Sequence, residues 1–329
     1  MDTFYDKAKA AELVESLAKE RQTQHPDAYY LSNISLSKEW QKNFDFIQRL
    51  NLPEWRLVFN GNSQSKTVSE TVLVVHGAVC GLDLPPLRAR VNPKRAMYLR
   101  QGLSITGYGS PMFGRSIEAV SKLYALFSRD IGEKNMADIE CVGTHQGFQS
   151  LNSSTHYLTK RDQAQDFQEL LIPQSIDPHR YLSEAARDRY VYTDDNEIFY
   201  YEWKTSESDE REFVDISSNK IQVGDIVEVH MMFIAVPVKD RKKKVVSTLR
   251  SVTLLDGNLT EVSFFLPVDF QADVLSKMAI AAKSNLRLQA SMAPRKRSVH
   301  DGEMINETGR KFSRMKIRDG EKMDSSSHD

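Results

Sequence analysis

Positively charged side chains gather in two short stretches of the chain, and both could bind phosphate. In the first, five of six consecutive residues are basic: Lys239, Arg241, Lys242, Lys243 and Lys244. The second runs from Leu87 to Gln101 without an acidic residue and contains Arg88, Arg90, Lys94, Arg95 and Arg100. Lysine and arginine neutralise backbone phosphates whatever the base sequence. Both stretches are therefore candidate nucleic-acid-binding surfaces, and the alternative for each is a solvated surface that binds nothing.

A glycine-rich stretch, Gly102 to Gly114, suggests a different anion site. Gly109, Gly114, Arg115 and Ser116 match the phosphate-loop pattern G-x-x-x-x-G-K-[ST], except that arginine stands in place of the lysine. A strand-like segment precedes this stretch and a helix-like segment follows it, which is the context that such a loop needs. Pro111 removes a backbone donor, however, and no later apolar strand ends in an aspartate that would hold magnesium. The pattern makes nucleotide or anion binding an alternative function.

Two cysteines each lie four residues from a histidine: His76 precedes Cys80, and His145 follows Cys141. Two thiolates and two imidazoles could hold zinc tetrahedrally if the segments meet, although neither cysteine has a second one nearby. The alternative is a pair of buried, apolar cysteines. The run from Leu73 to Gly77 is similar to the strand and His-Gly loop of α/β-hydrolases, but the G-x-S-x-G motif is absent. The sequence therefore leaves cofactors and catalysis undecided.

The first basic stretch lies between two strand-like runs. Apolar residues alternate with other residues from Val227 to Ala235, and the segment from Val245 to Leu255 is rich in β-branched residues. Turn dipeptides, Gly224-Asp225 and Asp256-Gly257, stand at the outer ends. This pattern predicts a long antiparallel hairpin with a basic tip, with Pro237 marking an edge position or a bulge.

The remaining patterns predict an α+β protein. Composition and apolar spacing favour helices over Asp6–Gln22, Leu36–Leu50, Ser116–Arg129, Asp162–Leu171, His179–Arg189 and Asp269–Lys283. Further strands are expected at Trp55–Phe59, Glu70–Val75, Leu103–Thr106, Asp138–Val142, Tyr190–Trp203 and Asp256–Leu266. We expect a helical N-terminal segment (1–52), a core with mixed helices and strands centred on the hairpin (53–284), and a polar, basic, disordered tail (285–329).

Composition limits the classes of function. The chain has 329 residues, 27% charged residues and a formal net charge of -1, so any nucleic-acid site must be a local patch. Two cysteines suit a reducing compartment, and we expect neither a signal peptide nor a membrane partner. Basic clusters at 295–297 and 310–318 are typical of nuclear import signals. The expected location is nuclear or cytoplasmic.

Several segments carry a resemblance. The sequences GDIVEV (224–229), VPVK (236–239), LRSVTLLDG (249–257) and NPKRAMYLRQGLSITGYGSPMFGRS (92–116) resemble those of a protein family from mushroom-forming (basidiomycete) fungi. The resemblance covers about residues 70–260. It implies a fungal, nucleus-containing host and brings no activity or fold with it.

The sequence as a whole favours an intracellular, non-enzymatic binding protein that contacts nucleic acid through its basic patches. One alternative is a nucleotide- or anion-binding protein or enzyme that uses the loop 109–116. Another is a structural, self-assembling module whose hairpin pairs with a second copy to form a homo-oligomer. The sequence does not decide the ligand, the metal content, the oligomeric state, or whether the basic patches share one face.

Overall fold

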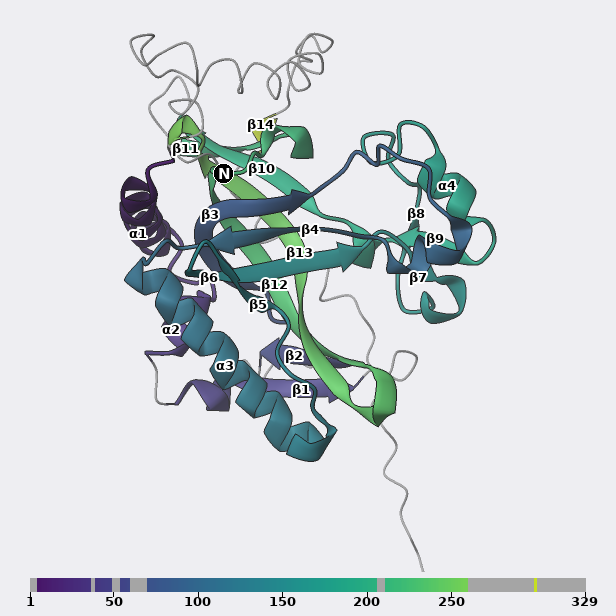
Figure 1. The fold of residues 1–329 in the computed structure, drawn as a ribbon, viewed down its shortest axis with the longest axis horizontal. Helices are drawn as coiled ribbons and strands as arrows, with labels where there is room; N and C mark the ends of the chain where they lie inside the picture. The colour runs from purple at the N-terminus through teal and green to yellow at the C-terminus, as the bar shows by residue number, and fades with distance from the viewer. Residues whose placement is uncertain are drawn as a thin grey trace, which may run out of the picture.

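The computed structural model describes residues 5–36, 39–48, 54–59, 70–205, 211–259 and 299–300. Strands of one large sheet form the centre of the molecule, helices cover part of it, and a small second sheet projects from one side (Figure 1). The predicted α+β class is confirmed. Outside the described residues lie the predicted helix at 269–283, most of the predicted strand at 256–266, and the tail apart from residues 299–300.

The predicted hairpin is the central feature of the large sheet. Strand β12 (Ile226–Pro237) pairs antiparallel with β13 (Lys243–Asp256), and every residue of β12 up to Ala235 is buried. Both faces of β12 are therefore covered by other parts of the protein, the apolar face and the mixed face that alternates with it. Pro237 ends β12 and is exposed, where its missing N–H interrupts no central pairing.

The sheet curls so that its strands surround a core. Beyond β12 come β3 (Leu73–Asp83), β4 (Arg100–Thr106), β6 (Phe148–His156) and the edge strand β5 (Val142–His145). Strand β6 returns to β13, where the Thr155 hydroxyl donates to the Leu249 carbonyl at 2.6 Å and the Ser247 hydroxyl donates to Ser153 at 2.9 Å. Leu73, Ile105, Leu151 and Val229 are among the buried side chains of the resulting barrel-like core.

Further strands extend the other end of the sheet. Strand β10 (Phe199–Thr205) runs parallel to β13, β11 (Arg211–Asp215) pairs with β10, and Val299–His300 form β14 against β11. Nine further strands of this eleven-stranded sheet thus surround or flank the hairpin. Short 3-10 helices connect elements at Trp40–Asn43 (η1), Pro93–Tyr98 (η2), Glu133–Asn135 (η3), Arg161–Gln163 (η4), Asp194–Asn196 (η5), Ser218–Lys220 (η6) and Lys239–Arg241 (η7).

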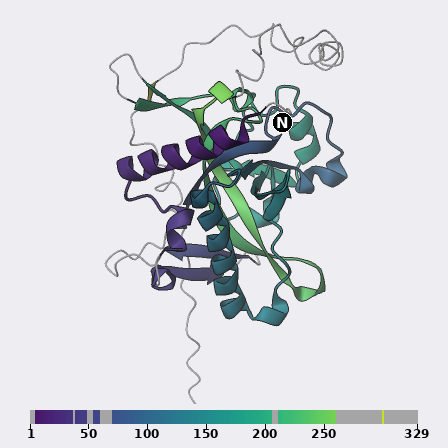
Figure 2. The same ribbon diagram turned by 60° about the vertical axis from the view of Figure 1, so that its left-hand side comes forward.

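Three helices pack on the barrel (Figures 1 and 2). They are α1 (Lys7–Gln24), α2 (Leu31–Ile34) and α3 (Pro111–Ile131). Helix α3 begins where the Ser110 side chain accepts from the Phe113 N–H, and it ends at Gly132, whose φ of 94° suits glycine. No helix in the described part of the chain is long and apolar enough to cross a membrane.

Two predicted helices were wrong. Within the predicted helix at 36–50, the described residues form η1 and then strand β1 (Phe44–Gln48), which pairs with β2 (Trp55–Phe59). Phe44 and Phe46 alternate with exposed Asp45, a strand period that the wider helical spacing concealed. Residues 162–171 contain η4 and strand β8 (Glu169–Leu170) instead of a helix, because the chain there pairs with a neighbouring strand.

The small sheet belongs to a compact side unit. It comprises β7 (Thr159–Lys160), β9 (Tyr190–Thr193) and β8, with α4 (Tyr181–Ala186) and η2 packed nearby. Its own core contains Ala96, Tyr157, Leu182 and Tyr192. We call residues 84–100 and 157–193 the side unit.

Asp195 and Asn196 fix the side unit to the barrel. The Gln101 amide donates to the Asn196 carbonyl at 2.8 Å, and the buried Arg250 guanidinium donates to the Asp195 carboxylate at 2.6 Å. The buried Arg56 guanidinium reaches the same carboxylate at 3.3 Å. Through η5, which directly follows it, the side unit is thus joined to β4 by a neutral hydrogen bond and to β13 and β2 by hydrogen bonds between charged groups.

Candidate nucleic-acid interface

A short 3-10 helix at the base of the side unit presents an aromatic ring next to positive charge. In η2 the side chains three residues apart lie above one another. Ala96 is buried, whereas Arg95 and Tyr98 are exposed, and Tyr98 keeps 68% of its surface in solvent. Arg95 and Tyr98 therefore share the solvent-facing edge of η2. Asn92 starts η2 by accepting a hydrogen bond from the Lys94 N–H at 3.0 Å.

Arg100 continues this edge onto strand β4. Its guanidinium donates to the Ser154 hydroxyl at 3.2 Å and to His156 Nε2 at 2.8 Å. Burial, followed by the positive charge of Arg100, lowers the pKa of His156 to about 4. The imidazole is therefore neutral at pH 7 and accepts through Nε2, which holds the guanidinium at the half-buried end of the strand. We call Lys94, Arg95, Tyr98 and Arg100 the η2 strip.

The whole side unit is positively charged. It holds ten lysines and arginines against six aspartates and glutamates, whereas the chain as a whole has a formal net charge of -1. Arg88 is exposed, and Arg90 lies over the Tyr181 ring at 5.9 Å from its centroid. Among the residues that the structure describes, no carboxylate forms an ion pair with Lys94 or Arg95. These charges can therefore meet an external anion without breaking an internal pair.

The basic stretch at 239–244 forms the end of the hairpin, as predicted, but only part of it is available. We call residues 239–244 the hairpin tip. Lys239, Arg241 and Lys242 are exposed. Lys243 lies over the Trp55 ring at 4.7 Å from its centroid, where burial lowers its pKa. Lys244 is paired with Glu140. Two of the five basic residues that were predicted to contact phosphate, Lys243 and Lys244, thus interact with other side chains of the protein.

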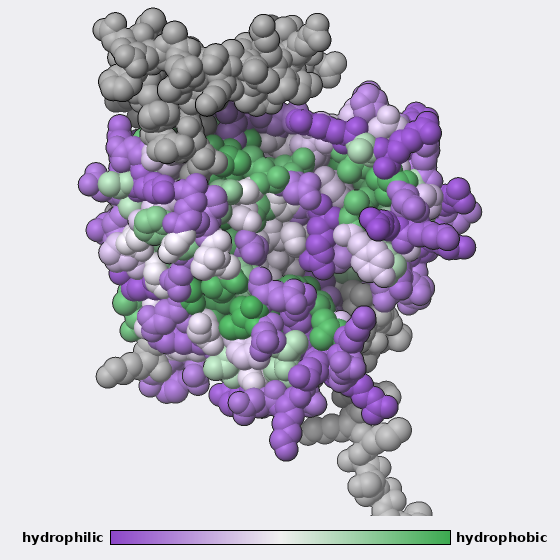
Figure 3. Space-filling view, in the orientation of Figure 1, coloured by the Kyte–Doolittle hydropathy of each residue, from purple (hydrophilic) through white to green (hydrophobic). Residues whose placement is uncertain are grey.

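The side unit and the hairpin tip lie on the same side of the barrel. In two views 60° apart, both project to the right, the side unit above and the hairpin tip below (Figures 1 and 2). Hydrophilic residues gather over both regions in the space-filling view (Figure 3). The two basic regions are therefore separate patches that face a common side, and they do not form one continuous surface.

The glycine-rich stretch does not form the predicted phosphate loop. Gly114, Arg115 and Ser116 lie inside helix α3, and only Gly109 remains in the turn before it. The Ser116 hydroxyl is buried and donates to the Met112 carbonyl of the same helix at 3.1 Å. It is consequently not turned toward a ligand.

The start of α3 already holds a carboxylate from α1. Glu15 accepts from the Ser110 hydroxyl at 2.8 Å and from the Met112 N–H at 3.0 Å. Burial raises the pKa of Glu15, but these hydrogen bonds outweigh burial and the pKa is lowered. An external anion at this helix start would have to displace an ionised side chain of the protein itself.

The two Cys–His pairs do not assemble into a zinc site. Cys80 and Cys141 have pKa values raised to about 11 by burial, which disfavours the thiolate that zinc needs. His76 is turned toward Glu228, whose Oε2 lies 2.9 Å from its Nε2. His145 lies on β5. Within the described ranges, no three His, Cys, Asp or Glu side chains are grouped to hold a metal ion.

A buried charge cluster surrounds Glu228, and sequence patterns did not predict it. The Arg21 guanidinium donates to both Glu228 oxygens at 2.8 and 2.9 Å, and His230 Nε2 lies 3.1 Å from the carboxylate. Arg21 also stacks on Trp203 and Phe213. Hydrogen bonds from Arg21 and both histidines outweigh the effect of burial, so the pKa of Glu228 lies well below its usual value. All these partners are buried, so the cluster fixes α1 to β12.

Comparison with known proteins gives little further information. No family model matches the chain, and no curated protein matches its sequence. Among solved structures the chain is similar to gp2.5, a single-stranded DNA-binding protein encoded by bacteriophage T7, with 10% identity and a TM-score of 0.34 over 69% of this chain and 99% of that one. It is also similar to the single-stranded DNA-binding protein from bacteriophage Enc34, with 6% identity and a TM-score of 0.30 over 72% and 98% of the two chains. TM-scores this low establish neither a shared fold nor a shared function.

Proposed function

We propose that the protein binds single-stranded nucleic acid through the η2 strip. The observation that carries this proposal is the exposure of Tyr98 on the same edge of η2 as Arg95. A base can stack on the tyrosine while the neighbouring cations neutralise the adjacent phosphates. Lys94 and the half-buried Arg100 extend the positive charge along the path of the strand.

The shape of the site favours an unpaired strand over a duplex. Reading a duplex through its major groove requires a projecting helix or a two-stranded ribbon. The side unit offers α4, which has six residues, and η2, which also has six. A single exposed tyrosine ring beside cationic side chains suits a base whose face is already exposed.

The hairpin tip supplies a second, weaker set of phosphate contacts. Its exposed residues, Lys239, Arg241 and Lys242, have no aromatic neighbour within the tip on which a base could stack. We assign to the tip an electrostatic role that is independent of sequence and that falls steeply with salt. The tip and the η2 strip would then contact different parts of one strand.

The test is a salt series of binding to labelled single-stranded DNA, single-stranded RNA and duplex DNA. Tyr98→Ala is expected to weaken single-strand binding by roughly fivefold to 100-fold, because stacking contributes about 1–3 kcal/mol per base. It should leave the salt slope unchanged. Replacing Lys94 and Arg95 with serine should reduce the magnitude of the salt slope by about one per lost phosphate contact.

A matched control removes the same charge from the opposite side of the molecule. Lys9 and Lys19 are exposed on α1, away from the side unit in Figure 1, and the serine double variant should bind almost as the parent does. Equal losses in both double variants would mean that net charge alone drives binding. Tighter binding to duplex than to single strands, or no binding at low salt, would overturn the proposal.

A further inference from the structure

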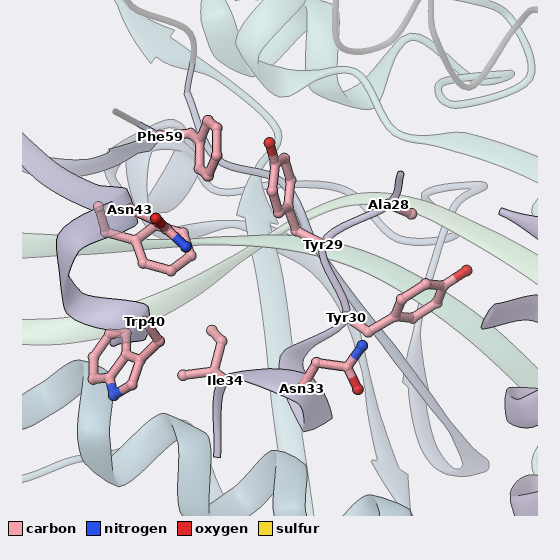
Figure 4. A pocket seen from close by; sticks show the side chains of 9 residues that line it. Ala28, Tyr29, Tyr30, Asn33, Ile34, Trp40, Asn43 and Phe59 are labelled. Atoms are coloured by element: carbon pink, nitrogen blue, oxygen red, sulfur yellow. The ribbon is translucent and has the colours of Figure 1, made fainter. Parts of the chain in front are cut away.

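A pocket with aromatic walls lies between α2, η1 and the ends of β1 and β2, away from the η2 strip. Its volume is about 210 Å³. The walls include four aromatic rings and two amides: Tyr29, Trp40, Phe44, Phe59, Asn33 and Asn43. Figure 4 shows the rings of Tyr29 and Phe59 side by side on one side of the pocket, with Trp40 and Ile34 on the opposite side.

The aromatic rings pack against one another at the walls and do not fill the pocket. The Tyr29 and Phe59 centroids are 4.5 Å apart, those of Phe44 and Phe59 are 6.0 Å apart in an edge-on arrangement, and those of Trp40 and Phe44 are 5.9 Å apart. These contacts fix the orientation of each ring before any ligand arrives. Trp40 is buried and forms part of the floor, whereas Tyr29 is 40% exposed and stands at the mouth.

The lining selects for a flat, uncharged molecule with polar edges. Among the described residues that line the pocket, none is charged. The amides of Asn33 and Asn43 are exposed, and each can both donate and accept. The volume is smaller than the roughly 300–1,000 Å³ of pockets that take drug-sized ligands, so it suits one ring system.

We propose that this pocket binds a nucleobase, with the base lying in the space that the aromatic rings border and its edge paired with the asparagine amides. Asparagine forms paired hydrogen bonds with the edge of adenine, which makes adenine the best probe. The uncharged lining leaves sugar and phosphate outside. This proposal stands apart from the η2 strip, because the two sites lie on different elements and share no residue.

The base could come from a free nucleoside or from a nucleic-acid strand. Strand β2 links the pocket to the hairpin tip. It ends at the pocket residue Phe59 and begins at Trp55, whose ring is in contact with Lys243 of the hairpin tip. Four residues of extended strand span about 13 Å. A strand held at the hairpin tip could therefore place a base in the pocket.

The experiment measures adenosine binding by saturation-transfer NMR and calorimetry, with ribose as the probe that lacks a base. Asn33→Trp fills the mouth of the pocket from an exposed position, and we expect it to weaken adenosine binding at least about tenfold, or 1.4 kcal/mol. Asn219→Trp is the matched control, since Asn219 is exposed on η6, and it should bind adenosine as the parent does. Thermal melting shows whether both variants remain folded.

Two further arms identify the source of the base and separate this proposal from the preceding one. If Asn33→Trp also weakens binding of a single-stranded oligonucleotide, the pocket takes a base from the strand. If it weakens adenosine binding alone, the pocket takes free nucleosides. Adenosine binding that survives Tyr98→Ala supports the pocket even if strands do not bind. Equal signals from adenosine and ribose, or adenosine binding that Asn33→Trp leaves unchanged, would overturn the proposal.

Discussion

The two basic stretches have similar charge but different surroundings. In the hairpin tip, Lys243 rests on Trp55 and Lys244 pairs with Glu140, so part of the charge stabilises the protein itself. In the η2 strip, Arg95 remains exposed beside Tyr98, and Arg100 is oriented by a neutral histidine. Charge density alone therefore does not identify a binding site, because the neighbours of each cation decide whether it can meet a ligand.

The largest expected effect separates the two regions directly. A combined variant of the η2 strip, with Lys94→Ser, Arg95→Ser and Tyr98→Ala, should bind single strands about 100-fold more weakly at low salt, because it loses stacking and two phosphate contacts. A combined variant of the hairpin tip, in which Lys239, Arg241 and Lys242 become serine, should lose only about threefold to tenfold. Fluorescence anisotropy measures both. A larger loss in the tip variant would reverse the ranking of the two regions.

A smaller effect depends on pH and belongs to the η2 strip alone. His156 has a pKa of about 4 in the folded protein and near 6.5 when unfolded. The unfolded chain therefore takes up the proton first as the pH falls. Stability from His156 is complete above about pH 6.5 and is lost as the pH falls toward 4. Allowing for its partial exposure, we expect a loss of about 2 kcal/mol.

The control for this pH effect is His156→Gln, which retains an acceptor for Arg100 but does not titrate. Urea unfolding at several pH values should show a flatter pH dependence for the variant than for the parent between pH 6.5 and 4. Parallel curves would mean that His156 carries its proton in the folded state near its usual pKa.

The smallest expected effect concerns the hairpin tip. Glu140→Ala removes the partner of Lys244, but the Glu140 side chain is 66% exposed, so the free energy of unfolding should change by less than about 0.5 kcal/mol. Strand binding at low salt should rise by about twofold, because a negative charge is removed and a lysine is released. The increase should disappear at high salt. A substantial loss of stability would show that the ion pair fixes the hairpin.

The sequence predicts the hairpin well because its alternation is a local signal. Strands β12 and β13 and helix α3 follow from apolar spacing alone. Strand β1 was missed because the spacing of Trp40, Phe44 and Ile47 fits a helix, and pairing with β2 overrides that preference.

The partners that distinguish the two basic stretches are not visible in the sequence. Glu140 lies 104 residues from Lys244, and Trp55 is still further from Lys243. The exposure of Tyr98 depends on the burial of its neighbour Ala96 in the core of the side unit, which unites segments far apart in the chain. Periodicity can locate a strand, but it cannot show which cation is already paired.

The ion pair between Arg21 and Glu228 also determines how the chain can be divided. A chain that begins after α1 would leave Glu228, which is 1% exposed, as a buried carboxylate without its guanidinium. Removing one partner of such a pair costs about 3–5 kcal/mol, a large share of the stability of a typical domain. The N-terminal helix and the barrel are therefore expected to fold as one cooperative unit, and we expect a chain cut at the predicted boundary between residues 52 and 53 to be destabilised.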